Sequence, residues 1–453
     1  MAVKHFNPPQ LIVISFMVAI IFGSMVLMLP AAVNGPPLRF IDALFTSASA
    51  VCVTGLVVVD TGTRFTLFGQ LTILALIQLG GLGIMTFSVV FVLLLGRKLA
   101  FREKLLISDA FSHLPVNDIR YLVRQILLFT VAIEGCGAVI LFCCWLPDFS
   151  WPHAGYLAVF HAISAFCNAG FSLFSDSLTS YRHDIFVNLT VMVLIIAGGL
   201  GFLVIMEIPY VVRQRLRHQR VRLTLHSKLV LLVTVLLIVG GTCLLFLTEQ
   251  VHTLSELSPG RGLLAAAFQA VSARTAGFNT LDIGSFGNPS LLIVILLMFV
   301  GASPGSCGGG VKTTAFGVFL LMCWSRFAGR DTVNLFGRTF PPSTIVDALT
   351  IIITASLVLI VFLLALSISE AQLHLPLAVE HGRFLHLLFE EVSAFATVGL
   401  STGVTPTLTD PGKFLLVLLM FTGRVGPLTA VLVWARRRPH GRYQYAEEQV
   451  MIG

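Results

Sequence analysis

Charge is scarce in this 453-residue chain: Asp, Glu, Lys and Arg together make up 11% of the residues, whereas hydrophobic residues make up 56%. Long apolar runs recur along it. Because about 20 consecutive apolar residues span a bilayer, this composition predicts a membrane protein that crosses several times and contacts lipid. The net charge of +7 then indicates basic loops beside a membrane rather than a nucleic-acid partner.

Metal-binding and hydrolytic motifs are also few. The eight cysteines form no C-x-x-C pair, and the adjacent Cys143 and Cys144 do not suit a zinc knuckle. Most cysteines lie in apolar runs, so we expect small buried side chains and no resident metal. An intramembrane enzyme would need a nucleophile–base or metal pair at membrane depth, and no H-E-x-x-H occurs. No enzymatic activity is therefore expected.

Eight apolar runs predict eight membrane crossings, near residues 11–33, 68–96, 121–146, 185–212, 229–247, 290–324, 345–368 and 414–435. The first run follows one lysine and has no A-x-A-like cleavage site, which favours a retained helix over a signal peptide. With Met1 inside, the internal segments hold 20 of the 29 Lys and Arg residues. This bias predicts a multi-pass protein of the cell inner membrane with both termini in the cytoplasm.

A fourfold repeat lies in the external connections. Each connection carries a short, half-apolar segment that ends in a glycine turn, and the segments read "IDALFTSASAVCVTGL", "LAVFHAISAFCNAGF", "LAAAFQAVSARTAGF" and "LHLLFEEVSAFATVGL". All four hold Phe, then Ser-Ala, then Gly followed by Leu or Phe. The Phe-to-Gly spacing is ten residues in three copies and nine in the third, from Phe268 to Gly277. Such periodicity indicates one structural unit used four times.

Each unit reads as a span, a half-helix that dips into the membrane, a glycine turn and a second span. Two crossings per unit make the copies parallel, whereas inverted repeats need an odd number. The predicted fold is an all-α membrane protein of eight transmembrane helices, arranged as four parallel span–pore-helix–span repeats around one central pore. The four quarters are residues 1–100, 101–225, 226–340 and 341–453.

The glycine turns are the candidate filter. Non-helical backbone at membrane depth is tolerated where it is buried or lines water, and its carbonyls can replace the hydration shell of a cation. A single T-x-G is usually only a turn, but four in register predict a pore. The candidate residues are Val53, Thr54, Gly55, Asn168, Ala169, Gly170, Thr275, Ala276, Gly277, Thr397, Val398 and Gly399.

A glycine-rich loop, "GASPGSCGGGVKTT" at residues 301–314, interrupts the sixth apolar run. A phosphate-binding P-loop ending at Lys312 would need glycines at 306 and 311, where Ser306 and Val311 stand. A movable plug across the conduction path and a static kink both remain possible. The plug is the favoured interpretation, with Gly305, Ser306, Gly308, Gly309, Gly310 and Lys312 as its residues.

Two cations, Lys312 and Arg424, fall inside apolar runs. A charge at membrane depth costs about 2.5–3.5 kcal/mol, so such a residue usually faces a cavity or a partner. Arg424 of the fourth quarter can donate hydrogen bonds to carbonyls of the loop. Lys312 has an alternative, because it can also snorkel to the cytoplasmic edge.

Other polar residues carry weaker signals. Glu207 lies near a cytoplasmic end, where a solvated face is expected, while the role of the deeper Glu134 stays open. His161 lies in the second half-helix, where we expect it to be packed. Three aspartates follow the turns and either concentrate cations or cap loops: Asp60, Asp176 and Asp282.

The motifs "SAVCVTGL", "SAFCNAGFSLFSDSL", "SARTAGFNT", "SAFATVGLSTG" and the loop at 301–314 resemble those of the Trk/Ktr/HKT potassium uptake family. The layout is most similar to its KtrB branch. The resemblance implies a single-chain pore with potassium in the filter, a glycine at Gly55 that favours potassium over sodium, and a gate-stabilising Arg424. It also implies a homodimer, a cytoplasmic KtrA-like ring that binds the nucleotide, and sodium dependence, with no cofactor on this chain. The alternative is a secondary cation symporter with a broken-helix binding site.

Overall fold

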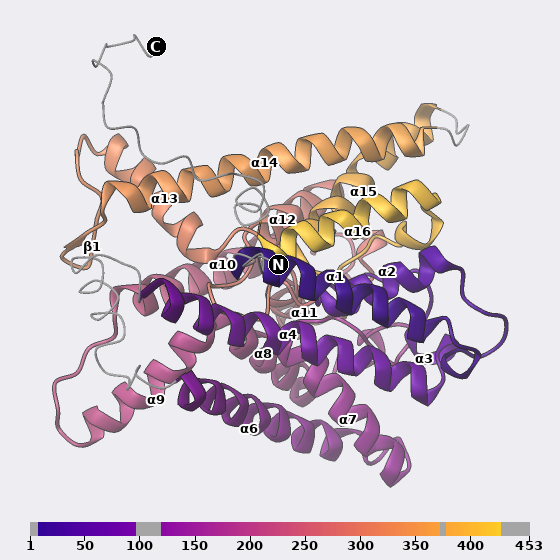
Figure 1. The fold of residues 1–453 in the computed structure, drawn as a ribbon. Coiled ribbons are helices and arrows are strands. Elements are labelled where there is room, and N and C mark those ends of the chain that lie inside the picture. The colour runs from indigo at the N-terminus through magenta and orange to yellow at the C-terminus, as the bar shows by residue number, and fades with distance from the viewer. Residues whose placement is uncertain (1–7, 97–118, 372–376, 427–453) are drawn as a thin grey trace, which may run out of the picture.

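The computed structural model describes residues 8–96, 119–371 and 377–426, and its regular structure is almost all helical (Figure 1). Four groups of helices follow one another along the chain. The first holds α1 (Pro8–Leu27), α2 (Phe40–Val51), α3 (Thr61–Arg64) and α4 (Leu67–Gly96), and the second holds α6 (Ile119–Trp145), α7 (Trp151–Phe166), α8 (Ile185–Leu200) and α9 (Phe202–Leu216). The third holds α10 (Leu225–Glu249), α11 (Pro259–Ser272), α12 (Asn288–Phe299) and α13 (Thr313–Phe327), and the fourth holds α14 (Pro342–Glu370), α15 (Leu377–Ala396) and α16 (Asp410–Val425).

Short elements complete the fold. Four single 3-10 turns lie at Pro30–Ala32, Thr179–Tyr181, Ile283–Ser285 and Thr405–Thr407. A small antiparallel hairpin, β1 (Asn334–Leu335) and β2 (Arg338–Thr339), pairs Asn334 with Thr339. It lies between α13 and α14, in a stretch predicted to be a cytoplasmic connection.

Among the described residues, three helices are long and apolar enough to cross a membrane: residues Val123–Trp145 of α6, then α10 and α14. The bent pair of α8 and α9 adds a fourth if it counts as one span. Eight crossings therefore remain a prediction. The end of the last predicted run, residues 427–435, lies outside the described residues.

The fourth predicted span was wrong in one respect, because it is not continuous. The chain bends by 103° between α8 and α9. Gly201 stands at the break with φ of +85°, a left-handed conformation that glycine adopts readily. The amide of Phe202 donates to the carbonyl of Gly305 in the glycine-rich loop at 3.1 Å. The break is therefore held by a contact with the interruption of the sixth run, which lies between α12 and α13 as predicted.

The short helices connect neighbouring groups in a closed circuit. The helices that precede the glycine turns, α2, α7, α11 and α15, are here called the short helices. Three of them pack against the helices before and after them in their own group, and α11 packs against α10. In addition, α4 contacts α7, α8 contacts α11, α12 contacts α15, and α16 contacts α2. The last group thus returns to the first, and the C-terminal ends of the four short helices face the interior of the circuit, where the glycine turns lie.

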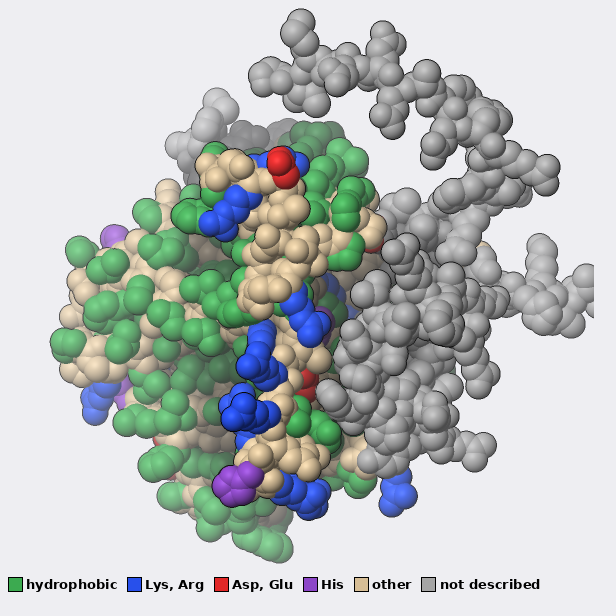
Figure 2. Space-filling model, turned by 90° about the vertical axis from the view of Figure 1, so that its left-hand side faces the viewer, with side chains coloured by type: hydrophobic (Ala, Val, Ile, Leu, Met, Phe, Trp, Pro, Cys, Tyr) green, Lys and Arg blue, Asp and Glu red, His purple; other side chains and the backbone are tan. Residues whose placement is uncertain are grey.

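Basic side chains gather on one face of the molecule. Figure 2 views the side on which α9, α13 and β1 lie in Figure 1, and a band of Lys and Arg runs down it between hydrophobic surfaces. Exposed members of the internal segments include Arg213, Arg215, Arg217, Arg220, Arg326 and Arg338. The flanking helices expose many large apolar side chains, including Val18, Phe22, Val193 and Ile353. Apolar surface this extensive fits contact with lipid rather than water.

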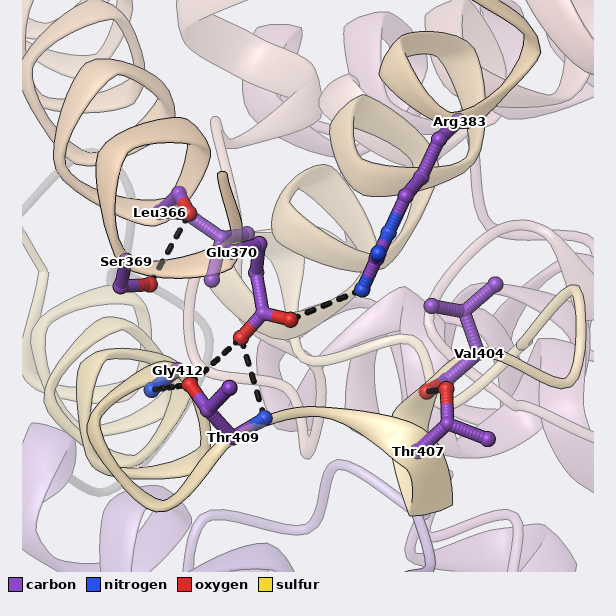
Figure 3. Close-up of polar contacts among 8 residues, drawn as sticks. All are labelled: Leu366, Ser369, Glu370, Arg383, Val404, Thr407, Thr409 and Gly412. Atoms are coloured by element: carbon purple, nitrogen blue, oxygen red, sulfur yellow. Dashed lines mark hydrogen bonds and ion pairs between the residues drawn. The ribbon is translucent and has the colours of Figure 1, made fainter. Parts of the chain in front are cut away.

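Figure 3 shows how a buried carboxylate ties three helices of the fourth group together. Glu370, the last residue of α14, pairs with Arg383 of α15 at 2.9 Å. Its other oxygen accepts from the amide of Thr409 at 3.0 Å and from the Thr409 hydroxyl at 2.7 Å, directly before α16. Glu249, the last residue of α10, likewise accepts from the amide of Gly287 before α12 at 3.1 Å. These contacts fix the ends of the helices on the side opposite to the basic band.

Candidate functional site

The four glycine turns share one unusual backbone conformation. The glycines have left-handed φ values of +93°, +67°, +82° and +91° in chain order, at Gly55, Gly170, Gly277 and Gly399. The residue two positions before each glycine is also left-handed, at +57°, +58°, +73° and +53° for Val53, Asn168, Thr275 and Thr397. Such φ values are uncommon for non-glycine residues and strained for β-branched ones. The repeat therefore extends to the backbone dihedrals, and the strain marks a functional site.

A serine in each short helix holds its turn in this conformation. Its carbonyl accepts from the amide before the glycine at 2.7–2.9 Å, pairing Ser49 with Thr54, Ser164 with Ala169, Ser272 with Ala276 and Ser393 with Val398. Three of the hydroxyls donate to the carbonyl after the glycine, on Leu56, Phe171 and Phe278. The fourth, on Ser393, accepts from the amide of Gly399 at 3.1 Å. These serines belong to the repeated Ser-Ala pair, but the sequence analysis gave them no role.

The turns meet edge to edge in a ring. A Cβ added at Gly55 would lie less than 3.0 Å from the carbonyl oxygen of Ala169, and the same holds for Gly170 with Ala276, Gly277 with Val398 and Gly399 with Thr54. Only glycine fits such close backbone approach. The structure thus brings all twelve predicted filter residues together. Carbonyl oxygens gathered in this way can replace the hydration shell of a monovalent cation.

A cavity of about 370 Å³, here called the vestibule, opens over the ring. The four glycines form its floor, and Asp60, Asp176 and Asp282 are among its lining residues. Each aspartate also caps a local turn: they accept from the amides of Thr63, Ser180 and Gly284 at 2.8, 3.0 and 3.1 Å. The two roles left open by the sequence, concentrating cations and capping loops, are therefore compatible.

The carboxylates of Asp60 and Asp176 are held in their charged form. Burial works to raise the pKa of Asp60, but hydrogen bonds from Ser175, Thr63 and Gly62 outweigh it and leave the pKa below its ordinary value. The pKa of Asp176 is lowered in the same way, because bonds from Ser180 and Thr179 outweigh its burial. Negative charge at the vestibule attracts cations.

The glycine-rich loop lies against the opposite side of the ring. A Cβ at Gly308 would lie less than 3.0 Å from the hydroxyl of Thr275, and the amide of Gly309 donates to the Thr397 hydroxyl at 3.0 Å. The loop folds on itself, because Val300 and Val311 form a parallel bridge and Gly301 donates to Val311 at 2.9 Å. The loop thus fills the space directly beneath the third and fourth turns.

Arg424 anchors the loop. One of its guanidinium nitrogens donates to the carbonyl of Cys307, and another donates to the carbonyl of Gly80 in α4 at 2.7 Å. The amide of Cys307 donates to Gly198 in α8 at 3.2 Å. Arg424 is 4% exposed. Cys307 is therefore held by residues of the second and fourth groups, and the first group holds Arg424 in turn through Gly80.

The remaining predicted gate residues shape the loop. Lys312 donates from Nζ to the carbonyl of Gly308 at 2.7 Å, so it bonds its own segment. Ser306 donates from its hydroxyl to Ser303 at 2.6 Å. Gly305 and Gly310 have left-handed φ values of +71° and +67°.

The loop contains a motif that the sequence analysis overlooked. Residues 301–305 fit the G-x-S-x-G pattern of serine hydrolases, with Ser303 at the nucleophile position. Its hydroxyl accepts from the Thr313 hydroxyl at 3.0 Å. In the described part of the chain no histidine bonds Ser303, and the strand before a nucleophile elbow is replaced by α12. The geometry of a catalytic triad is thus not present there.

Three other polar residues take defined positions. Glu134 accepts from the amide of Gln78 at 3.2 and 3.3 Å. Glu207 accepts from the amide of Thr224, the N-cap residue of α10, at 2.6 Å, and so holds the start of that helix instead of facing solvent freely. His161 is fully buried and packs edge-on against Trp145. No three His, Cys, Asp or Glu side chains gather into a metal site within the described ranges.

Comparison with known proteins finds relatives that match nearly the whole chain. The profile of the TrkH family, described as cation transport protein, matches residues 4–445. Ktr system potassium uptake protein B of Bacillus subtilis is 40% identical over 452 residues, 99% of this chain and 97% of that protein. Potassium/sodium uptake protein NtpJ of Enterococcus hirae is 37% identical, over 99% of this chain and 98% of that one. The crystal structure of the potassium transporter TrkH from Vibrio parahaemolyticus shares the fold, with a TM-score of 0.72 at 20% identity over 96% of this chain and 86% of that chain.

Proposed function

Because this chain belongs to the TrkH family of cation transport proteins, we propose that it takes up potassium across the cell inner membrane. The observation that carries the proposal is the ring of four turns with left-handed backbone at two matching positions each. Strained backbone of this kind persists where a function requires it. The names of the full-length relatives, potassium and potassium/sodium uptake proteins, support the choice of ion.

In this proposal the ion loses its water between the turns. Backbone carbonyls of residues 53–55, 168–170, 275–277 and 397–399 form the filter, and the aspartates of the vestibule concentrate the ion before it enters. Glycine at Gly55 favours potassium, because a serine there would crowd the carbonyl of Ala169. No enzymatic step is involved.

Eight spans surround the filter as four parallel quarters, with boundaries near residues 100, 225 and 340. The closed circuit of contacts from α4 to α7 and finally from α16 to α2 supports this arrangement. The basic face on α9 and α13 would be cytoplasmic, as would both termini. The vestibule would then face outward.

The glycine-rich loop is the gate. Two observations support this role. The loop fills the space beneath the third and fourth turns, and Arg424 holds it at Cys307. Opening requires the loop to leave the ring, and a loop this rich in glycine can move without a side chain to withdraw.

The proposed assembly is a homodimer gated by a cytoplasmic KtrA-like ring. Support comes from the name of the relative in Bacillus subtilis, which designates one protein of a Ktr system. The nucleotide would bind the partner ring, and this chain would hold no cofactor besides the potassium it carries. Sodium dependence is proposed as well, since the relative in Enterococcus hirae is named a potassium/sodium uptake protein.

Uptake of potassium or rubidium by a transport-deficient bacterial strain tests the proposal. We expect the full-length chain to restore growth at low potassium and to admit the ion, more so with its cytoplasmic partner. A well-expressed chain that admits neither ion would contradict it. The symporter alternative is supported by the two broken helices, and reversal potentials separate the two: a fixed coupling ratio between two ions would favour the symporter.

A further inference from the structure

One position in the repeat carries a different polar residue in each quarter. It directly follows the repeated phenylalanine and holds, in chain order, Thr46, His161, Gln269 and Glu390. Each of these side chains is at most 2% exposed. All four lie on a short helix behind a glycine turn, and buried polar groups generally have a hydrogen-bonding task. Two of them reach the rim of the vestibule.

Glu390 bonds the segment that follows the fourth turn. One carboxylate oxygen accepts from the Ser401 hydroxyl at 2.7 Å, and from the amide and hydroxyl of Thr402 at 2.8 and 3.2 Å. The other oxygen accepts from the Thr405 hydroxyl. Ser401 stands two residues after Gly399 and lines the vestibule. A single buried carboxylate thus holds this whole rim.

His161 does the same after the second turn. Its Nδ1 donates to the carbonyl of Leu157 at 2.8 Å, because a carbonyl can only accept. Nε2 is then left to accept from the Ser172 hydroxyl at 3.0 Å and the amide of Leu173 at 3.4 Å. Ser172 stands two residues after Gly170 and also lines the vestibule. The ring stacks on Phe174 with centroids 4.9 Å apart, which fixes its orientation.

The other two quarters lack this connection. The hydroxyl of Thr46 donates to the backbone carbonyl of Asp42 in its own helix at 2.8 Å. The side-chain amide of Gln269 forms no hydrogen bond with any of the described residues. The second and fourth quarters are not neighbours in the circuit of contacts, so the two connections stand on opposite sides of the ring.

We propose that His161 and Glu390 are positioning residues that brace the outer rim of the filter from two opposite sides and so maintain its preference for potassium over sodium. The inference rests on the proposed function. A ring that discriminates between ions by their size needs carbonyls that keep their positions. Both braces act through a serine at the same place in the repeat, Ser172 and Ser401, and neither touches the ion.

The test compares Glu390→Gln with Glu391→Gln in the full-length chain reconstituted into lipid vesicles. Glu391 is the matched control, because it is equally buried yet neither of its carboxylate oxygens bonds residues 400–405. Initial uptake of potassium and of sodium gives the preference of each variant. We expect Glu390→Gln to reduce the preference about tenfold, the size expected when hydrogen bonds to a buried carboxyl group are weakened. Glu391→Gln should match the parent.

The serines supply a second route that does not disturb the buried carboxylate. Ser401→Ala and Ser172→Ala should each lower the potassium preference, and Ser401→Ala should add little to Glu390→Gln, because both remove one connection. His161→Phe keeps the packed ring and removes the acceptor, so it should resemble Ser172→Ala. If Glu390→Gln does not reach the membrane, Ser401→Ala decides the question.

The outcomes separate this inference from the function on which it rests. A parent chain that carries neither ion overturns the proposed function. In another outcome the parent prefers potassium and three variants prefer it to the same degree: Glu390→Gln, Ser401→Ala and Ser172→Ala. That result overturns the bracing role of His161 and Glu390 and leaves the proposed function in place. A loss of preference in Glu391→Gln equal to that in Glu390→Gln would also contradict them, since general loosening of α15 would then explain both.

Discussion

At the scale of single residues, the filter depends on backbone strain that its surroundings maintain. Val53, Thr275 and Thr397 are β-branched and left-handed, a state that costs about 1–3 kcal/mol each. The serines of the short helices hold that state through paired hydrogen bonds to each turn. The ring is therefore preorganised before any ion arrives, and changes at its glycines should affect selectivity before they affect folding.

Replacing Gly55 with serine should lower the preference for potassium over sodium by about an order of magnitude, because the new Cβ would meet the Ala169 carbonyl and the backbone is left-handed. The inhibition of rubidium uptake by added potassium or sodium measures this preference. Gly337→Ser is the matched control: Gly337 has φ of +75° but no atom within 4 Å of an added Cβ, and it lies in the hairpin between β1 and β2. Equal selectivity in parent and Gly55→Ser would remove Gly55 from the filter.

The vestibule aspartates predict how uptake responds to pH. Because the pKa of Asp60 and of Asp176 lies below its ordinary value, both charges are present above that lowered pKa and are lost only as the pH falls through it. The half-saturating potassium concentration should thus stay constant as the external pH falls from about 7 to about 5, since ordinary aspartates titrate near 4. Uptake kinetics at several pH values measure it.

Asp176→Asn should raise that concentration a few-fold at low salt and less at high salt, where screening weakens surface charge. Asp184→Asn is its control, because Asp184 caps α8 and is not among the lining residues of the vestibule. A different result would contradict the prediction for pH. If the half-saturating potassium concentration of the parent already rises several-fold by pH 5, the aspartates lose their charge at a higher pH than the hydrogen bonds imply.

At the scale of elements, the two broken helices meet at the glycine-rich loop, the proposed gate. The amide of Phe202 at the start of α9 bonds Gly305, and Arg424 in the last turn of α16 bonds Cys307. The loop is thus attached to the second and fourth groups while belonging to the third. Its position beneath the ring follows from these attachments and from the hydroxyls of Thr275 and Thr397.

Sequence pattern predicted the sixth-run break but not the fourth. The loop is marked by five glycines, Pro304 and Lys312 within an apolar run. The segment around Gly201 has a weaker signal, three glycines at 198, 199 and 201 without a proline or a charge, and it was predicted to be a continuous span. Glycines alone do not show that a helix breaks, and the bend at Gly201 is also held by the hydrogen bond from Phe202 to the distant Gly305, which local pattern does not contain. The twelve filter residues were found because they repeat in register. The braces at His161 and Glu390 were not, because the residue type differs in every copy.

Deleting residues 305–309 should raise the maximal ion flux while leaving the potassium preference near that of the parent, because the deletion removes the proposed gate and the four turns keep their residues. Rubidium efflux from loaded vesicles, normalised to the amount of protein, measures it. A folded deletion with flux equal to or below the parent, still dependent on the cytoplasmic partner, would make the loop a structural kink.

Arg424→Ala should increase flux in the same direction but less, by one to two orders of magnitude at most, because hydrogen bonds from a charged group are worth about 1.5–3 kcal/mol. Arg383→Ala is the matched control. It also removes a largely buried arginine, but one that pairs with Glu370 rather than with the loop. Equal gains in both variants would indicate general loosening instead of gating.

At the scale of the whole molecule, the circuit of helix contacts and the charge distribution define an axis. The vestibule lies on one side of the ring, and the glycine-rich loop lies on the other. The band of basic residues on α9 and α13 covers one end of the molecule (Figure 2). Together they support the proposed orientation, in which the vestibule faces outward and the basic band faces the cytoplasm.

Thiol labelling tests this orientation. A cysteine at Asn34 should react with a membrane-impermeant reagent added outside intact cells, whereas one at Gln219 should react only after the inner face is exposed. Both positions are exposed in the structure. The parent chain, with its eight native cysteines, gives the background. Labelling of Gln219 from outside and of Asn34 from inside would reverse the orientation and place the vestibule in the cytoplasm.

The location of the permeating ion tests the central claim most directly. A crystal structure of the full-length chain soaked in rubidium or thallium would reveal the ion by its anomalous scattering. We predict peaks on the axis between the four turns, within coordination distance of the carbonyls that precede Gly55, Gly170, Gly277 and Gly399. Peaks confined to the break between α8 and α9, with none between the turns, would contradict the claim and favour a broken-helix binding site.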